Sequence, residues 1–125
     1  MIKIAVPPNS VEIYNDNTEE VIKSSTYIEV RPNSEIKLMC VAADSKPAAD
    51  ITWLKNNTRL FDVVQEDFPG GEPGLITRKS RVKYNSGNDN ADIKCSVSHP
   101  ALRRPIRSLV HLQIDGPTSK FIKKH

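Results

Sequence analysis

Apolar and polar residues alternate in several short segments of the chain. In residues 34–42 the positions that share one face are Ile36, Leu38, Cys40 and Ala42. Because side chains of a strand point alternately to its two faces, this period of two predicts a half-buried β-strand. No segment has the apolar spacing of an amphipathic helix. The pattern therefore predicts an all-β chain.

Further strands are expected at intervals along the sequence, separated by turn residues. They cover residues 11–14, 27–30, 50–55, 59–61, 76–84 and 91–97, with a last strand that begins near Ile106. Asn56 and Asn57 form an expected hairpin turn, since asparagine tolerates a positive φ. Residues 64–74 contain several glycines and prolines and predict a loop or a weak edge. Seven or eight short strands indicate an antiparallel sandwich, with a barrel as the alternative.

The two cysteines help to choose between these folds. Cys40 and Cys95 are too far apart in the sequence to form a zinc-binding pair, whose members lie roughly two to four residues apart. They fit one long-range disulfide or two free buried thiols. Both face inward on their strands, and Trp53 lies on the strand after the first cysteine, an order typical of immunoglobulin sandwiches. We expect a Cys40–Cys95 disulfide beside a buried Trp53, although Ile93 replaces the corner tyrosine of many such domains.

Composition limits the chain to a small number of protein classes. Its 125 residues fit one domain, and a hydrophobic share of 38% is enough for a core. No apolar run approaches the roughly 18 residues that would span a bilayer, and no stretch near the first residue resembles a secretory signal. The excess of 18 basic over 15 acidic residues is mild, so we expect no nucleic-acid partner.

The sequence contains no recognisable catalytic constellation. Its histidines, His99, His111 and His125, are scattered, and none has a neighbouring serine or cysteine with an acid-base partner. We therefore expect no enzyme, no catalytic residue, no cofactor and no metal site. For His99 we expect a structural role in a loop, with its ring bonded to a backbone carbonyl.

Asn56-Asn57-Thr58 is the only N-glycosylation sequon. It falls on the expected hairpin turn, where a glycan would be exposed. The sequence thus predicts a glycan on Asn56, and the alternative is an unmodified, solvated turn.

Basic residues gather in two segments that we expect to lie near each other on the surface. The first contains Arg78 and Arg81 together with Lys79 and Lys83, and the second contains Arg103, Arg104 and Arg107. One interpretation is a solvated face that keeps the domain soluble. The other is a docking patch for an acidic protein or a sulfated glycan, whose attraction would fall as salt rises.

Three strings of residues resemble a known family. They are Val6-Pro7-Pro8-Asn9, then Ser45-Lys46-Pro47-Ala48-Ala49 with Ile51 and Trp53, then Cys95-Ser96-Val97-Ser98-His99-Pro100-Ala101-Leu102. They are similar to the second immunoglobulin domain of nectin-like synaptic cell adhesion molecules, and nectins and receptors of the Kirrel and Sidestep type share parts of the pattern. Two stretches depart from it: residues 15–25 are longer than expected, and residues 68–74 are richer in glycine and proline.

The resemblance implies a fold, a location and a function. The fold would be an immunoglobulin-like β-sandwich of the C2 or I type, with two antiparallel sheets joined by a disulfide. Residues 1–8 would be a linker from a preceding domain, residues 9–115 the domain and residues 116–125 an exit linker. The domain would be extracellular, at the cell surface, anchored only through other segments of a longer protein.

The implied role is that of a spacer and protein-binding module in an adhesion receptor. Its partners would be other cell-surface proteins of the immunoglobulin family, bound homophilically or heterophilically. The alternative function is a glycan-binding module that uses the basic residues.

Overall fold

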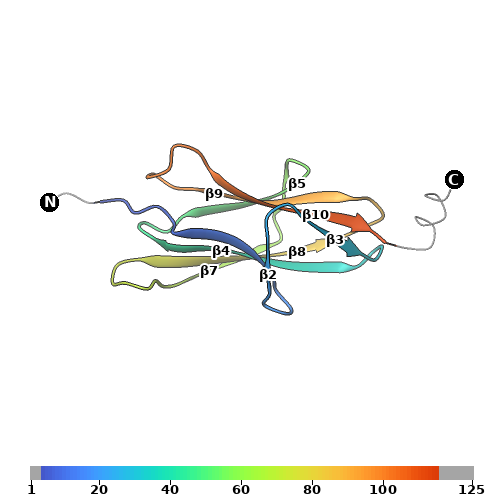
Figure 1. The fold of residues 1–125 in the computed structure, drawn as a ribbon, viewed down its shortest axis with the longest axis horizontal. Coiled ribbons are helices and arrows are strands. Elements are labelled where there is room, and N and C mark those ends of the chain that lie inside the picture. The colour runs from blue at the N-terminus through green and yellow to red at the C-terminus, as the bar shows by residue number, and fades with distance from the viewer. Residues whose placement is uncertain (1–3, 116–125) are drawn as a thin grey trace.

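The protein forms two β-sheets packed face to face, as Figure 1 shows. The computed structural model describes residues 4–115, and within this range all regular elements are strands. Their bounds are β1 Ser10–Asn15, β2 Val21–Ile22, β3 Thr26–Val30, β4 Glu35–Ser45, β5 Asp50–Lys55, β6 Thr58–Arg59, β7 Val63–Pro69, β8 Ile76–Asn85, β9 Ala91–Ser98 and β10 Ile106–Ile114. The predicted all-β immunoglobulin-like sandwich is thus confirmed.

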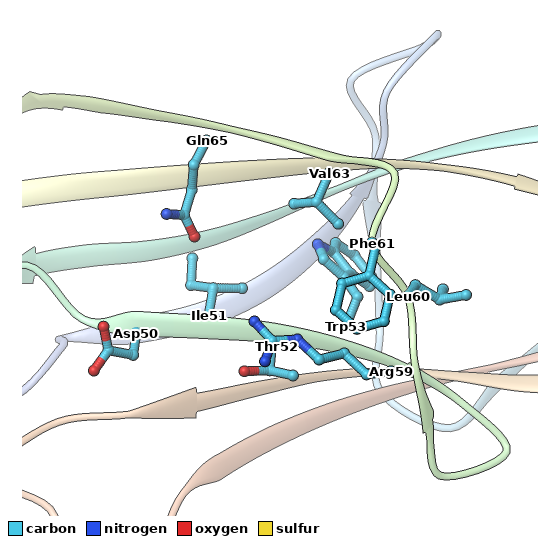
Figure 2. A pocket seen from close by; sticks show the side chains of 9 residues that line it. All are labelled: Asp50, Ile51, Thr52, Trp53, Arg59, Leu60, Phe61, Val63 and Gln65. Carbon is cyan, nitrogen blue, oxygen red and sulfur yellow. The ribbon is translucent and has the colours of Figure 1, made fainter.

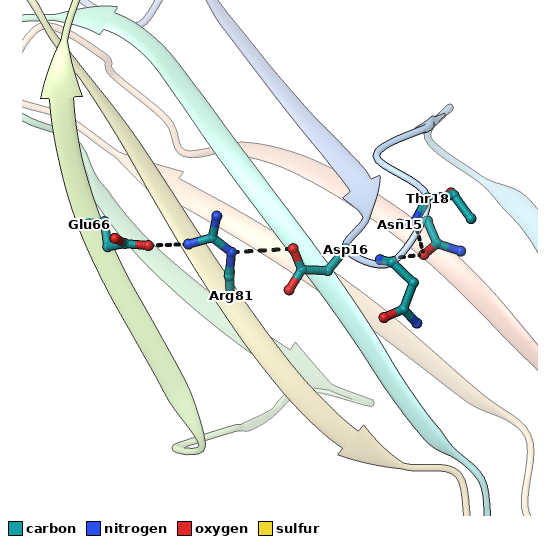
Figure 3. A network of polar contacts seen from close by, with 6 residues as sticks. Asn15, Asp16, Thr18, Glu66 and Arg81 are labelled. Carbon is teal, nitrogen blue, oxygen red and sulfur yellow. Dashed lines mark hydrogen bonds and ion pairs between the residues drawn. The ribbon is translucent and has the colours of Figure 1, made fainter.

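The first sheet has the strand order β2-β1-β4-β8-β7, and the second has the order β3-β10-β9-β5-β6. Neighbouring strands are antiparallel except β3, which runs parallel to β10. The chain changes sheets between β1 and β3, and the unusually long segment between them forms the β1–β2 hairpin. At the start of this hairpin, Asn15 Oδ1 accepts hydrogen bonds from the backbone N–H groups of Asn17 and Thr18 (Figure 3). The extra residues thus form a hairpin whose turn begins with a local side-chain cap.

Three strands differ from the sequence prediction. The two-residue strand β2, Val21–Ile22, lies where no strand was expected. The strand expected at residues 59–61 is shorter and displaced, because β6 covers only Thr58–Arg59. Part of the region expected as a loop or weak edge is the strand β7, which pairs with β8 along its whole length. All of its residues except Val63 are exposed, so β7 lacks the alternating burial that identifies a strand in the sequence. Its charged residues and its terminal Pro69 are typical of an edge strand.

The two sheets are joined at the centre of the sandwich. A disulfide links Cys40 on β4 to Cys95 on β9, with 6.4 Å between the Cα atoms. Trp53 on β5 is only 1% exposed, and its indole N–H donates to Ser80 Oγ on β8 at 3.0 Å. One covalent bond and one buried hydrogen bond thus cross the same core. The order of the two cysteines and the tryptophan predicted the disulfide beside a buried Trp53, but not the hydrogen bond.

Short polar side chains hold the turn before β9, where the corner tyrosine is missing. Ile93 is fully buried in its place. Asn90 Oδ1 accepts a hydrogen bond from the Ile114 backbone N–H at 2.8 Å, and Ser86 Oγ accepts one from the Ser34 N–H at 3.0 Å. These contacts tie the turn to β10 and to the start of β4.

The loop between β7 and β8 requires glycine because it lies close against β4. A Cβ atom on Gly70 would lie 2.7 Å from Asp44 Oδ1 and 2.8 Å from Leu75 Cβ, and Cβ atoms in proteins essentially never come this close to other atoms. The same Asp44 oxygen accepts a hydrogen bond from the Gly71 N–H at 2.7 Å. The glycine-rich departure from the family pattern therefore packs a loop tightly onto an irregularity in β4.

Candidate interaction surfaces

The sequon lies on the tight turn between β5 and β6. Asn56 and Asn57 have φ values of 47° and 71°, as the sequence predicts for a two-residue hairpin turn, and both side chains are exposed. Asn56 Oδ1 accepts a hydrogen bond from the Asp92 N–H at 2.9 Å. This hydrogen bond to the side-chain oxygen fixes the orientation of the Asn56 carboxamide, whose nitrogen lies on the exposed turn.

His99 fixes the loop between β9 and β10. The Ala101 backbone N–H donates to His99 Nδ1 at 3.0 Å, so Nδ1 is unprotonated and Nε2 donates to the Pro47 carbonyl at 2.9 Å. The ring is 6% exposed. The predicted bond to a backbone carbonyl is present, and it holds this loop against the loop between β4 and β5.

Arg78 is engaged in structural contacts on the first sheet. Its Nε and one terminal nitrogen donate to the two carboxylate oxygens of Asp67 on β7, at 2.7 and 2.9 Å. Its other terminal nitrogen donates to the Ala49 carbonyl at 2.9 Å, just before β5 of the second sheet. The hydrogen bond from Arg78 lowers the pKa of Asp67 below its ordinary value. Arg78 thus attaches the edge strand and bridges the two sheets.

Arg81 lies between two carboxylates on the outer face of the same sheet, as Figure 3 shows. Its Nε donates to Asp16 Oδ1 at 3.2 Å, and a terminal nitrogen donates to Glu66 on β7. Burial lowers the pKa of Arg81, but the hydrogen bonds to Asp16 and Glu66 outweigh this effect and raise it. The positive charge of Arg81 is therefore largely balanced.

The second basic segment is free of such contacts within residues 4–115. Arg103, Arg104 and Arg107 are exposed, and among the described residues no carboxylate pairs with them. They belong to the loop before β10 and to β10 itself, in the second sheet, whereas Arg78 and Arg81 belong to β8 in the first. The two basic segments therefore belong to different sheets and do not form one basic face of a single sheet.

The Arg78–Asp67 pair predicts a specific dependence of stability on pH. Since the folded pKa of Asp67 lies below its ordinary value of 3.8, the pair stabilises the fold above that pH, and the stabilisation is lost as pH falls through the lower folded value. We expect Asp67→Asn to cost less than about 1 kcal/mol at neutral pH, because the pair is partly exposed. Thermal melts from neutral pH down to about pH 2 should converge for the two proteins in acid. Arg78→Gln should abolish the same pH-dependent difference, and a constant difference at every pH would contradict the assignment.

Several exposed apolar side chains surround β7, and sequence reasoning did not single them out. The exposed fractions are 79% for Phe61, 60% for Val64 and 37% for Phe68. The Arg59 guanidinium lies 5.3 Å from the centre of the Phe61 ring, and Lys79 Nζ lies 4.7 Å from that of Phe68. The only sequence signal was the spacing of Val64 and Phe68 on one face of a short segment.

A groove opens between the two sheets beside β7. Its volume is about 370 Å³. Figure 2 shows its lining, which includes Ile51 and Trp53 from β5 and Val63 and Gln65 from β7. Because β6 is so short, this side of the sandwich is not closed by a further strand. Core residues therefore approach the surface along the free edge of β7.

A second surface cluster lies on the outer face of the second sheet. The rings of Tyr27 and His111 stack with their centres 4.4 Å apart. His111 Nδ1 lies 2.6 Å from Asp92 Oδ1. Tyr27 is 64% exposed, so an aromatic ring is fixed and available at this surface.

Neither a metal centre nor a membrane span is found in residues 4–115. No group of three or more His, Cys, Asp or Glu side chains in this range is arranged to hold a metal ion. No helix within it has the length and apolar character needed to cross a membrane.

Two β-sheets joined by a disulfide, with a buried tryptophan in the core beside it, are the defining features of an immunoglobulin domain. The chain belongs to the CD80-like C2-set immunoglobulin domain family, which it matches over residues 10–106. It is 27% identical to human Cell adhesion molecule 1 over 113 residues, which cover 90% of this chain and 23% of that protein.

Other relatives agree with this assignment. The chain is 35% identical to Cell adhesion molecule 2 of Xenopus tropicalis over 75 residues, which cover 58% of this chain and 17% of that protein. It is 34% identical to rat Nephrin over 85 residues, which cover 66% of this chain and 7% of that protein. The chain thus spans less than a quarter of each of these relatives. The fold is similar to the crystal structure of Rst D1-D2, with a TM-score of 0.74 and 20% identity, covering 90% of this chain and 52% of that one.

Proposed function

We propose that this chain is an extracellular domain of a cell-surface adhesion receptor that binds other immunoglobulin-family proteins and spaces its neighbouring domains. The observation that carries the proposal is the similarity to Cell adhesion molecule 1 along 90% of the chain. The Cys40–Cys95 disulfide supports an extracellular location, because disulfides persist mainly in oxidising compartments. Its chemistry is noncovalent recognition.

The shape of the molecule supports the role of a spacer. In Figure 1 the chain enters at one end of the long axis, and β10 ends at the opposite end. The disulfide and the Trp53–Ser80 hydrogen bond make the body between these ends a single packed unit. A unit of this kind holds whatever is attached at its two ends at a fixed distance.

The proposed domain organisation has a linker on each side of the sandwich. We assign residues 9–115 to the domain, residues 1–8 to an incoming linker and residues 116–125 to an exit linker. Val6 exchanges two backbone hydrogen bonds with Lys46, so the end of the incoming segment is attached to the loop that follows β4. Residues 1–3 and 116–125 lie outside the described residues.

Protein recognition can be tested on an array of cell-surface ectodomains from the source organism. The chain is applied to this array in a multimerised form. We expect saturable binding to one or a few immunoglobulin-family ectodomains, including this chain itself if recognition is homophilic. Multimerisation is needed because single contacts between adhesion domains are weak, and avidity strengthens them. Saturable binding confined to ectodomains of other families would contradict the proposal.

Glycan binding is a second candidate function, and three exposed arginines favour it, because none of them pairs with a carboxylate among residues 4–115. Because Arg78 and Arg81 are already paired with carboxylates, we expect only Arg103, Arg104 and Arg107 to contribute. Replacing these three by alanine should lower the salt concentration at which the chain leaves a heparin column, since each contact releases counterions. The matched double variant of Arg78 and Arg81 with glutamine should retain most of the affinity. Unchanged retention of the triple variant would exclude this function.

We further propose that Asn56 carries an N-glycan when the chain is secreted. The sequon lies on an exposed turn, and the oriented carboxamide presents its nitrogen there. Protein from a secretory eukaryotic host should lose mass on treatment with an N-glycosidase, and Asn56→Gln protein should not. An unchanged mass of the unsubstituted protein would contradict the proposal.

A further inference from the structure

β7 is the longest edge strand among the described residues, and β8 is its only sheet neighbour. The other sheet edges are formed by β2 and β6, with two residues each, and by β3, with five. An open strand edge presents unpaired backbone groups that another strand can bind. The backbone groups that β7 leaves open determine which strand can bind there.

The register of β7 against β8 determines the open groups. The Lys83 N–H donates to the Asp62 carbonyl, and the next residue, Val63, lies opposite Val82. Hydrogen-bonded and non-hydrogen-bonded pairs alternate along an antiparallel ladder. The even-numbered residues of β7 therefore bond to β8, and the odd-numbered residues direct their backbone groups to the free edge.

Two of these odd-numbered positions are not fully available. The Val63 N–H already donates to the Phe61 carbonyl at 2.9 Å, and Pro69 has no N–H group. The positions with both a free donor and a free acceptor are Gln65 and Asp67. The available edge is thus three residues long and centred on Glu66.

We propose that the β7 edge binds the β7 edge of a second copy of the chain, antiparallel, about a two-fold axis that passes through Glu66. This register places Gln65 of each copy opposite Asp67 of the other, so that the open backbone donors and acceptors satisfy one another. Any other register would place one of these residues opposite Val63, Pro69 or a residue outside the strand. The proposal goes beyond the function proposed above, because dimerisation is measured without an adhesion partner.

The side chains match in the same register. On the inner side, the carboxamide of Gln65 lies beside the carboxylate of Asp67 of the second copy, a hydrogen-bond donor beside a negative acceptor. On the outer side, exposed Val64 lies beside Phe68 of the second copy, and cross-strand apolar pairs of this kind stabilise sheets. Lys79 on the neighbouring strand β8 places its ammonium over the Phe68 ring, 4.7 Å from the ring centre.

One contact opposes the dimer and limits its strength. Glu66 lies beside Glu66 of the second copy, and like charges in opposite positions are destabilising. Arg81 offsets this repulsion, because it bonds to Glu66 from within the same copy. A two-fold contact of this kind is closed and does not propagate into fibres. The edge therefore supports a weak, discrete dimer.

Cysteine cross-linking of the whole 125-residue chain, with Cys40–Cys95 intact, tests the register. Glu66→Cys should form a covalent dimer under mild oxidation about tenfold faster than Lys83→Cys, an exposed control on β8. Val64→Cys alone should not cross-link faster than this control, whereas a mixture of Val64→Cys and Phe68→Cys should. Equal rates for Glu66→Cys and Lys83→Cys would overturn the proposal, as would rapid cross-linking of Val64→Cys to itself.

Sedimentation equilibrium supplies a second readout without cysteines. Val64→Lys should raise the dissociation constant of the dimer about tenfold or more and leave the unfolding temperature unchanged, since Val64 is exposed. Glu66→Gln should lower the dissociation constant, because it removes the like charges on the axis. A monomeric unsubstituted chain at every concentration would also overturn the proposal. Binding to other immunoglobulin-family ectodomains on the array would be unaffected by that outcome, so the two proposals fail separately.

Discussion

Replacing both Cys40 and Cys95 by alanine is expected to lower the free energy of unfolding by about 4 kcal/mol. The disulfide closes a loop with a sequence separation of 55, and a cross-link of this span removes much of the conformational freedom of the unfolded chain. A domain of this size has a total stability of roughly 5 to 15 kcal/mol. The variant should therefore be marginally folded at room temperature, as measured by chemical denaturation followed by circular dichroism.

A reduction experiment provides the control for this prediction. The unsubstituted chain unfolded in the presence of a reductant should show the same loss of stability as the double variant. Agreement between the two would show that the loss comes from the cross-link rather than from the alanines. A loss much smaller than 1 kcal/mol in both would contradict the structural role of the disulfide.

Replacing Trp53 by alanine should lower the free energy of unfolding by about 3 to 5 kcal/mol, since it removes the largest buried side chain of the core. The indole also bonds to Ser80 across the two sheets, so the substitution leaves a buried hydroxyl without its partner. The same denaturation experiment measures the change. A loss below about 1 kcal/mol would mean that the two sheets do not depend on the indole.

Ser80→Ala separates the hydrogen bond from the packing of the ring. It leaves the indole in place but removes the acceptor of its N–H, which should cost about 1 to 3 kcal/mol. When both Trp53 and Ser80 are replaced by alanine, the loss in free energy of unfolding should be smaller than the sum of the losses of the two single variants. Each single substitution already removes the same hydrogen bond. Strict additivity would indicate that the contact between the two side chains contributes little.

Much of the fold follows from the sequence because its signals are local. In β9 every second residue is buried, and in β5 the buried Ile51 and Trp53 are separated by a partly exposed residue, so this period is visible along the chain itself. In β4 the residues of the predicted inner face are also buried or partly buried, but Met39 between them is buried as well. The order of the two cysteines and Trp53 then indicates which strands face each other. The turn at Asn56 was likewise predictable, since it depends on the conformational preference of two adjacent residues.

The surface was harder to predict because it depends on register between distant segments. Arg78 and Arg81 are basic residues on a strand, and nothing beside them in the sequence shows that Asp67, Asp16 and Glu66 balance their charges. The sequence left the region of β7 open between a loop and a weak edge for a related reason. The residues of this strand are exposed, so its position at the sheet edge depends on hydrogen bonds to β8 rather than on an apolar face.

The central claim is that this domain recognises proteins at the cell surface. Its most direct test is the binding of the fluorescent, multimerised chain to live cells of the source organism, before and after two treatments. We predict saturable binding that is abolished when trypsin removes surface proteins and that persists after heparinase removes sulfated glycans. Binding that survives trypsin but is lost after heparinase would contradict protein recognition and favour the arginine-dependent alternative.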